Sequence, residues 1–334
     1  LLTVGGLAGA YYWGQQQFDA PGPAAQEFTF VVPKGAGLNQ IAQRLESEGL
    51  ITNAYVFRAG AHVLDKATAL KAGEYTIPAG ASMRDILGIL ESGKSLLYKL
   101  TVAEGLTTAM IIDLVKKHPD LTGQVTYLPE EGALLPETYL FERGTTRDDL
   151  LRRMAADHNK VLDELWATRA ADLPIKTKYE AVILASIIEK ETSKPEERPR
   201  VAGIFVNRLR KGMKLETDPT IIYGITRGYP LGRGIRKSEL EAKTPYNTYQ
   251  IVGLPPTPIA NPGRESIAAA LQPMQTDEIF FVADGTGGHA FAVTLAQHEA
   301  NVRRWREIEK EKAARAAAAA GAPAPAPAPE TAGN

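Results

Sequence analysis

The sequence contains no cysteine, and this absence excludes disulfide bonds, thiolate metal sites and a cysteine nucleophile. Five histidines are present, but no two of them form an HExxH pair, so we expect no zinc site. The GxGxxG turn of dinucleotide-binding proteins is missing, as are the serine motifs GxSxG and SxxK. We therefore predict that the protein needs no metal and no cofactor.

The chain also has no marked excess of positive or of negative charge. The net charge is −1 over 334 residues, and no basic tract occurs, so nucleic acid is not an expected partner. Hydrophobic residues make up 44% of the chain and charged residues 23%, which is typical of globular proteins. This length predicts two or three domains.

Residues 1–13 read LLTVGGLAGAYYW and are followed by polar GQQQ. This stretch is too short to cross about 30 Å of hydrocarbon, but aromatic residues followed by polar ones are typical of the outer edge of a membrane span. A buried strand or a signal-peptide remnant is the alternative. We predict that residues 1–14 are the remnant of a transmembrane anchor and that 15–27, which contain DAPGPAAQ, form a linker.

One pattern occurs repeatedly in the N-terminal third. VPKGAGLNQIAQRLES begins at Val32, IPAGASMRDILGILES begins at Ile77, and a fainter third copy begins at Val102. Each copy predicts a short strand, a Pro/Gly turn and an amphipathic helix. Such units resemble the LysM glycan-binding module, although a plain α/β scaffold explains them equally well.

The rest of the chain predicts an α+β protein. The expected elements are a strand and turn in 134–146, a helix over 147–169, two helices in 172–213 divided near 193–195, a strand or turn in 215–224, a short helix at 266–273, a hairpin over 279–294 and a final helix over 295–320. The expected domains are a LysM-like module at 28–97, a connecting α/β region at 98–170, a larger domain at 171–310, and a helical end with a disordered Ala/Pro tail at 311–334.

The helix that contains AVILASIIEKETSK, residues 181–194, ends in two carboxylates. Helical spacing places Glu191 on an apolar stripe made of Leu184, Ile187 and Ile188. Glu189 belongs to a face of smaller residues. Desolvation raises the pKa of a carboxyl group, and a carboxyl that stays protonated near neutral pH can act as a general acid. The alternative is a solvated Glu191 at a frayed helix end, or one paired with Lys190 or Lys194.

Four long blocks follow one another in order: LASIIEKET, IFVNRLRKGMKLETDPTIIYG, TPYNTYQIVGLPPTPIANPG and FFVADGTGGHAFAVTLAQHEANV. Together they resemble the endolytic murein transglycosylase family (MltG/YceG-like), over roughly residues 28–310. The resemblance implies that Glu191 is the catalytic acid/base, that 171–310 is the catalytic domain, and that an anchor and a LysM-like module precede it.

The resemblance also implies a reaction. The MurNAc–GlcNAc β-1,4 bond of peptidoglycan is cleaved within glycan strands without water, a 1,6-anhydro-MurNAc end forms, and elongation of nascent strands is terminated. One carboxyl group suffices, because the nucleophile belongs to the substrate, whereas an ordinary glycosidase uses two. Asp218 is the second carboxylate for an alternative hydrolytic muramidase, unless it only caps the turn before Pro219. A non-enzymatic glycan-binding scaffold of wall synthesis is a further alternative.

Six further residues are candidates for substrate binding: Thr217, Asp218, Tyr246, Asn247, Thr248 and His289. The YNT stretch offers aromatic and amide groups suited to sugars, or else it is only turn structure around Pro245. Expected partners are glycan strands and penicillin-binding wall synthases. The expected location is the bacterial inner (cytoplasmic) membrane, crossed once, with the catalytic domain in the periplasm.

Overall fold

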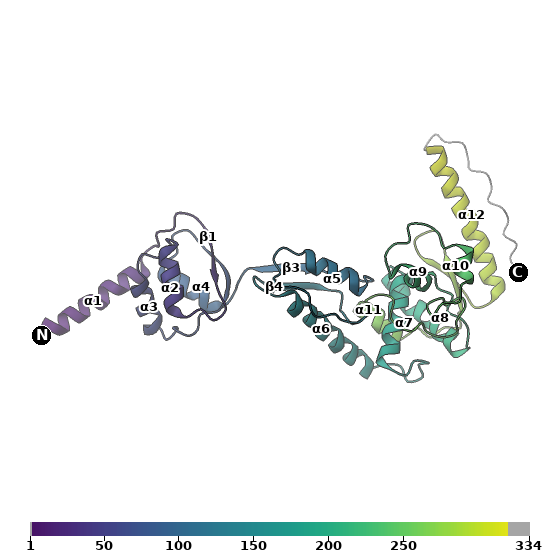
Figure 1. Cartoon of the computed structure of the whole chain (residues 1–334), viewed down its shortest axis with the longest axis horizontal. Coiled ribbons are helices and arrows are strands. Elements are labelled where there is room, and N and C mark those ends of the chain that lie inside the picture. Colours follow the sequence, from purple (N-terminus) through teal and green to yellow (C-terminus); the bar gives the residue numbers. More distant parts are fainter. Residues whose placement is uncertain (1, 320–334) are drawn as a thin grey trace. The chain divides into compact units, whose positions relative to one another are not determined.

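The computed structural model describes residues 2–319, and its elements are labelled in Figure 1. The chain is α+β, as predicted from the sequence. It forms two compact units, each assembled from separate stretches of sequence. The first comprises residues up to 100 with 118–123 and 138–147, and the second comprises 101–117, 124–137 and the chain from 148 onward.

The first unit contains the predicted repeat. Strand β1 (Phe28–Val32) pairs antiparallel with β2 (Gly73–Ile77), and helices α2 (Leu38–Ser47) and α3 (Ala54–Val63) lie between them in sequence. Helix α4 (Met83–Ser92) follows β2 just as α2 follows β1. The turn glycines Gly35 and Gly80 both have left-handed backbones, with φ of 80° and 68°, a conformation that favours glycine. Residues 32–47 and 77–92 therefore share one local structure, and the repeat is confirmed.

The N-terminal helix α1 (Leu2–Asp19) continues into the segment expected to be a linker. Phe18 is buried in the core of the first unit, and Asp19 forms an ion pair with Arg84 at 2.5 Å. No helix within residues 2–319 is both long and apolar enough to cross a membrane. The expected membrane anchor therefore stays a prediction. The Ala/Pro tail from residue 320 lies outside the described residues.

A second pair of strands, β3 (Leu97–Thr101) and β4 (Thr138–Glu142), forms its own two-stranded sheet. Helices α5 (Thr108–Lys117) and α6 (Arg147–Ala167) follow these strands in sequence. The strand expected in 134–146 and the helix expected at 147–169 are confirmed.

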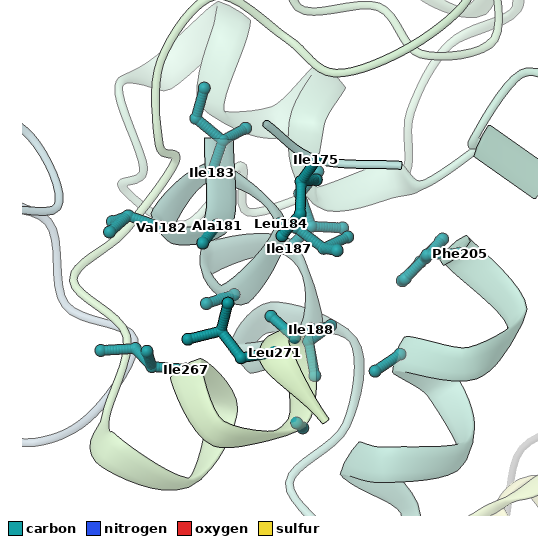
Figure 2. Close-up of a cluster of buried hydrophobic side chains, with 14 of the residues drawn as sticks. Ile175, Ala181, Val182, Ile183, Leu184, Ile187, Ile188, Phe205, Ile267 and Leu271 are labelled. Carbon is teal, nitrogen blue, oxygen red and sulfur yellow. The ribbon is translucent and has the colours of Figure 1, made fainter. Parts of the chain in front are cut away.

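The core of the second unit surrounds α7 (Lys178–Glu191), the helix with the two terminal carboxylates. Every residue from 181 to 188 is buried, because α7 packs against α8 (Arg198–Arg210), α9 (Asp218–Thr226) and α11 (Arg264–Leu271). Figure 2 shows its apolar side chains between those of α8 and α11. The helix is therefore hydrophobic all round over this stretch.

The segment 215–224 corrects one expectation, since it forms helix α9 and not a strand or turn. Thr217 is the N-cap and Pro219 stands in the first turn, where its missing N–H costs nothing and its fixed φ favours a helix. Asp218, the first helical residue, interacts favourably with the helix dipole. These residues are typical of a helix start, but the β-branched residues of the segment favoured a strand in the sequence-based prediction.

The remaining elements shape one side of the second unit. Strands β5 (Phe280–Ala283) and β6 (His289–Ala292) form the predicted hairpin, with Ala283 opposite His289. Helix α12 (Leu295–Ala319) packs against both strands. A short helix, α10 (Lys237–Glu241), interrupts the Gly/Pro-rich region before them.

Candidate active site

Glu191, the last residue of α7, lies in a cleft. Two cavities, of about 290 and 390 Å³, are both lined by Glu191, Ala283 and His289. Glu191 therefore stands where the two halves of the cleft meet. The hairpin β5–β6 supplies the facing wall.

The carboxyl group of Glu191 has no ion-pair partner within the described residues. Burial raises its pKa from 4.5 to about 7, Asp218 adds to this effect, and the Thr217 hydroxyl opposes it. Neighbouring Lys190 donates to the Gly105 carbonyl oxygen at 3.3 Å instead. Glu191 is partly buried and is not paired with a lysine, and its raised pKa lets the carboxyl group keep a proton up to near-neutral pH.

The Glu189 side chain is also buried, with 4% exposed, but its carboxylate is fully paired. Oε1 lies 3.1 Å from an Arg198 guanidinium nitrogen, and Oε2 accepts a hydrogen bond from the Gly263 N–H at 3.0 Å. The expectation that Glu191 is desolvated agrees with its raised pKa, but the sequence did not indicate that Glu189 is buried as well. Both carboxylates are buried, and they differ in their partners.

Asp218 reaches the cleft from the start of α9, whereas Thr217 lines neither cavity. Thr217 is 2% exposed, and its hydroxyl lies close enough to the Glu191 carboxyl to oppose the rise in that group's pKa, although no hydrogen bond of ordinary geometry joins the two. Asp218 lines the larger cavity and accepts a hydrogen bond from the Tyr249 hydroxyl at 2.7 Å. Tyr249 also lines that cavity, and burial together with Asp218 raises its pKa, so it acts as a neutral donor. Sequence reasoning missed Tyr249, although it ends the YNTY stretch.

Tyr246, Asn247 and Thr248 line neither cavity. The Asn247 amide donates to three backbone carbonyl groups within 239–242. The Thr248 hydroxyl accepts from the Thr217 N–H at 3.0 Å. In this structure these residues hold the loop that positions α9, and their proposed contacts with substrate stay predictions.

His289 lines both cavities and is held by a residue that sequence reasoning missed. The Glu197 carboxylate lies 2.7 Å from its Nδ1 and accepts from its backbone N–H at 2.9 Å. No local sequence signal joins these two residues, which are 92 positions apart.

The outer walls of the cleft carry further polar groups. Trp305 and Lys312 of α12 line the smaller cavity together with three glycines of the hairpin turn. The Lys312 ammonium lies 5.8 Å from the Trp305 ring centre and donates to the Gly285 carbonyl oxygen at 2.8 Å. This wall combines an aromatic face with a cation.

No group of carboxylates and histidines within residues 2–319 is arranged to hold a metal ion. The letters GILESGKS, residues 88–95, fit the spacing GxxxxGK[ST] of a phosphate-binding loop. However, residues 88–92 lie within α4 and Gly93 is its C-cap, whereas a phosphate-binding loop precedes its helix. This motif match therefore does not indicate a phosphate-binding site.

An unpaired carboxyl group with a raised pKa in an open cleft defines a site for general acid–base chemistry. The chain belongs to the YceG-like family, whose profile matches residues 30–304. This confirms the resemblance predicted from the sequence.

Three individual proteins illustrate the relationship. The chain is 28% identical to the endolytic murein transglycosylase of Streptococcus pneumoniae serotype 2 (strain D39 / NCTC 7466), over 90% of this chain and 62% of that protein. It is 29% identical to the endolytic murein transglycosylase of Bacillus subtilis (strain 168), over 87% of this chain and 89% of that protein. The crystal structure of a yceG-like protein from Listeria monocytogenes matches with a TM-score of 0.50 and 28% identity, over 82% of this chain and 98% of that one.

Proposed function

We propose that this protein is a peptidoglycan lytic transglycosylase that cleaves MurNAc–GlcNAc β-1,4 bonds within glycan strands and leaves 1,6-anhydro-MurNAc ends. The observation that carries the proposal is Glu191, an unpaired carboxyl with a pKa of about 7 in an open cleft. The names of the Streptococcus and Bacillus relatives support it.

Glu191 serves first as an acid and then as a base. Its proton passes to the glycosidic oxygen, the bond from that oxygen to C1 of MurNAc breaks, and GlcNAc leaves with a free hydroxyl group. The Glu191 carboxylate then takes the proton of the MurNAc C6 hydroxyl, whose oxygen attacks C1 and closes the anhydro ring. Glu191 ends protonated and no water is consumed. A pKa near neutrality suits both steps.

The shape of the cleft supports cleavage inside a strand. Because cavities of about 290 and 390 Å³ meet at Glu191, saccharide units can extend from it in both directions. A site that removes only terminal units would be closed on one side.

A hydrolytic muramidase is the second candidate, and Asp218 favours it. This carboxylate lines the larger cavity beside Glu191, and a second carboxylate can activate water or attack C1. In a lytic enzyme Asp218 would only help to raise the pKa of Glu191. Asp218→Asn should then leave the product unchanged.

Mass spectrometry of digested sacculi separates the candidates. We expect anhydro-muropeptides from the wild type and from Asp218→Asn, and none from Glu191→Gln. Reducing-end products that vanish in Asp218→Asn would establish the muramidase. An absence of any product from the wild type would favour the non-enzymatic scaffold.

We also propose that the protein is anchored once in the inner membrane, acts in the periplasm beside penicillin-binding wall synthases and terminates nascent strands. The exposed Tyr11, Tyr12 and Trp13 on α1 support a position next to a membrane. The helix pair between the antiparallel strands β1 and β2 supports a LysM-like glycan-binding module. Protease should reach the folded part in spheroplasts, and cells with Glu191→Gln should make longer glycan strands. Protection from protease, or unchanged strand length, would count against these proposals.

A further inference from the structure

Glu197 connects three elements of the cleft through one carboxylate. It ends the 3-10 turn Pro195–Glu197 between α7 and α8. Its Oε2 accepts from the Thr192 hydroxyl at 3.0 Å and lies 2.7 Å from His289 Nδ1, while Oε1 accepts from the His289 backbone N–H at 2.9 Å. Thr192 is the C-cap of α7, directly after Glu191. The carboxylate thus joins the end of the catalytic helix to the first residue of β6.

The charge of Glu197 fixes the proton on the neutral imidazole ring. Burial alone would raise the pKa of Glu197, but the hydrogen bonds from His289 and Thr192 outweigh burial and lower it. Glu197 is therefore an anion at neutral pH and can only accept hydrogen bonds. When the imidazole of His289 is neutral, its proton therefore lies on Nδ1, and Nε2 presents a lone pair.

The free nitrogen faces the cleft. No residue within 2–319 hydrogen-bonds to Nε2, and Nε2 is not among the buried atoms that lack a partner. The ring lines both cavities beside Glu191. It also meets Phe281 edge to face, with centroids 5.2 Å apart, so that packing holds its orientation.

We propose that Glu197 is a positioning residue, which fixes His289 so that Nε2 accepts a hydrogen bond from a hydroxyl group of the saccharide bound across Glu191. This inference rests on the proposed function and adds a specific acceptor to the binding site. Without the Glu197 carboxylate, the imidazole can move its proton to Nε2 and face the sugar as a donor. The required alignment of the hydroxyl group would then be lost.

The first test needs no variant. Long-range proton–nitrogen NMR spectra of the full chain, labelled at histidine and assigned with His289→Asn, should show the neutral His289 ring protonated at Nδ1. A ring protonated at Nε2 in the wild type would overturn the proposal.

The second test removes the carboxylate. In Glu197→Ala the proton should move to Nε2, and kcat/KM on purified glycan strands should fall about 10- to 100-fold, as for other carboxylates that orient a functional histidine. Glu196→Gln, an exposed neighbour on the same turn, should change neither quantity. A Glu197→Ala protein that keeps the wild-type tautomer and activity would contradict the proposal.

A double variant separates positioning from a merely structural role. If Glu197 acts through His289, the variant with both His289→Ala and Glu197→Ala should be no less active than His289→Ala alone. Additive losses would mean that Glu197 acts elsewhere. Failure of the proposed function would differ from both results, because Glu191→Gln would then keep its activity while the tautomer remained as assigned.

Discussion

The carboxyl groups of Glu189 and Glu191 both lie at the C-terminal end of α7 in the second unit, but their surroundings are opposite in kind. At Glu189, the guanidinium of Arg198 and the Gly263 N–H satisfy both oxygens. At the Glu191 cleft no cation of residues 2–319 pairs with the carboxyl group, whose pKa is raised mainly by burial and is modulated by the Thr217 hydroxyl and by the charges of more distant groups.

The difference shows that burial does not by itself make a carboxyl group reactive. A buried anion with a guanidinium partner stays ionised and serves the structure. A buried carboxyl without one keeps its proton to a higher pH. The unpaired carboxyl group of Glu191 is therefore the better proton donor.

Replacing the unpaired carboxyl group of Glu191 should have the largest effect on activity. Glu191→Gln keeps the size and the helix but can neither donate nor accept the proton, so activity on sacculi should fall by at least about 10²-fold. The melting temperature should not fall. Full activity in this variant would remove Glu191 from the mechanism.

The stability of the same variant should depend on pH. The folded-state pKa of Glu191, about 7, lies above the ordinary 4.5, so this group's contribution to stability is complete below pH 4.5 and is lost as the pH rises through 7. Glu191→Gln has no titratable group at this position, so this loss of stability does not occur in the variant. Urea unfolding should show equal stability of variant and wild type near pH 4.5, and a variant more stable by up to about 3 kcal/mol above pH 8. A constant difference would contradict the raised pKa.

Glu189→Gln should lower stability and change activity little, which is the opposite of the effect expected for Glu191→Gln. It leaves the buried Arg198 with the half-exposed Glu104 as its remaining ion-pair partner, which should cost about 1–3 kcal/mol of unfolding free energy. Activity per folded molecule should change far less than in Glu191→Gln. Glu196→Gln is the matched exposed control and should stay within about 0.5 kcal/mol of the wild type. Equal losses of activity in the Glu189 and Glu191 variants would refute the comparison.

Replacing a residue of the outer cleft wall should have the smallest effect on activity. Trp305→Ala removes an aromatic face from the smaller cavity, which should raise KM for glycan strands about 2- to 10-fold at unchanged kcat. Trp166→Ala is a control with an aromatic residue outside both cavities. A fall in kcat without any change in KM would mean that Trp305 supports the acid–base group and not the substrate.

Features encoded locally could be predicted from the sequence. The two repeats and the hairpin follow from alternation, turn residues and helical spacing within about 20 residues, and Glu191 could be placed at the end of a buried helix. Segment 215–224 was misjudged because β-branched residues outweighed the signals of Pro219 and the N-cap Thr217.

Features that depend on distant residues could not be predicted. The pairing of Glu189 could not be predicted, because nothing in the sequence indicates that Arg198 and Gly263 converge on it from other segments. The contact between Glu197 and His289 bridges 92 positions and has no local pattern. Helical spacing gives the face on which a carboxylate lies, but its partner depends on the tertiary fold.

A direct titration of the Glu191 carboxyl tests the central claim most closely. Carbon-13 NMR of glutamate-labelled protein, with the Glu191 signal identified by its absence in Glu191→Gln, should give a midpoint near 7 for Glu191. A Glu191 midpoint near 4.5 would show that the group is an ordinary solvated carboxylate, and it would contradict the account of the cleft.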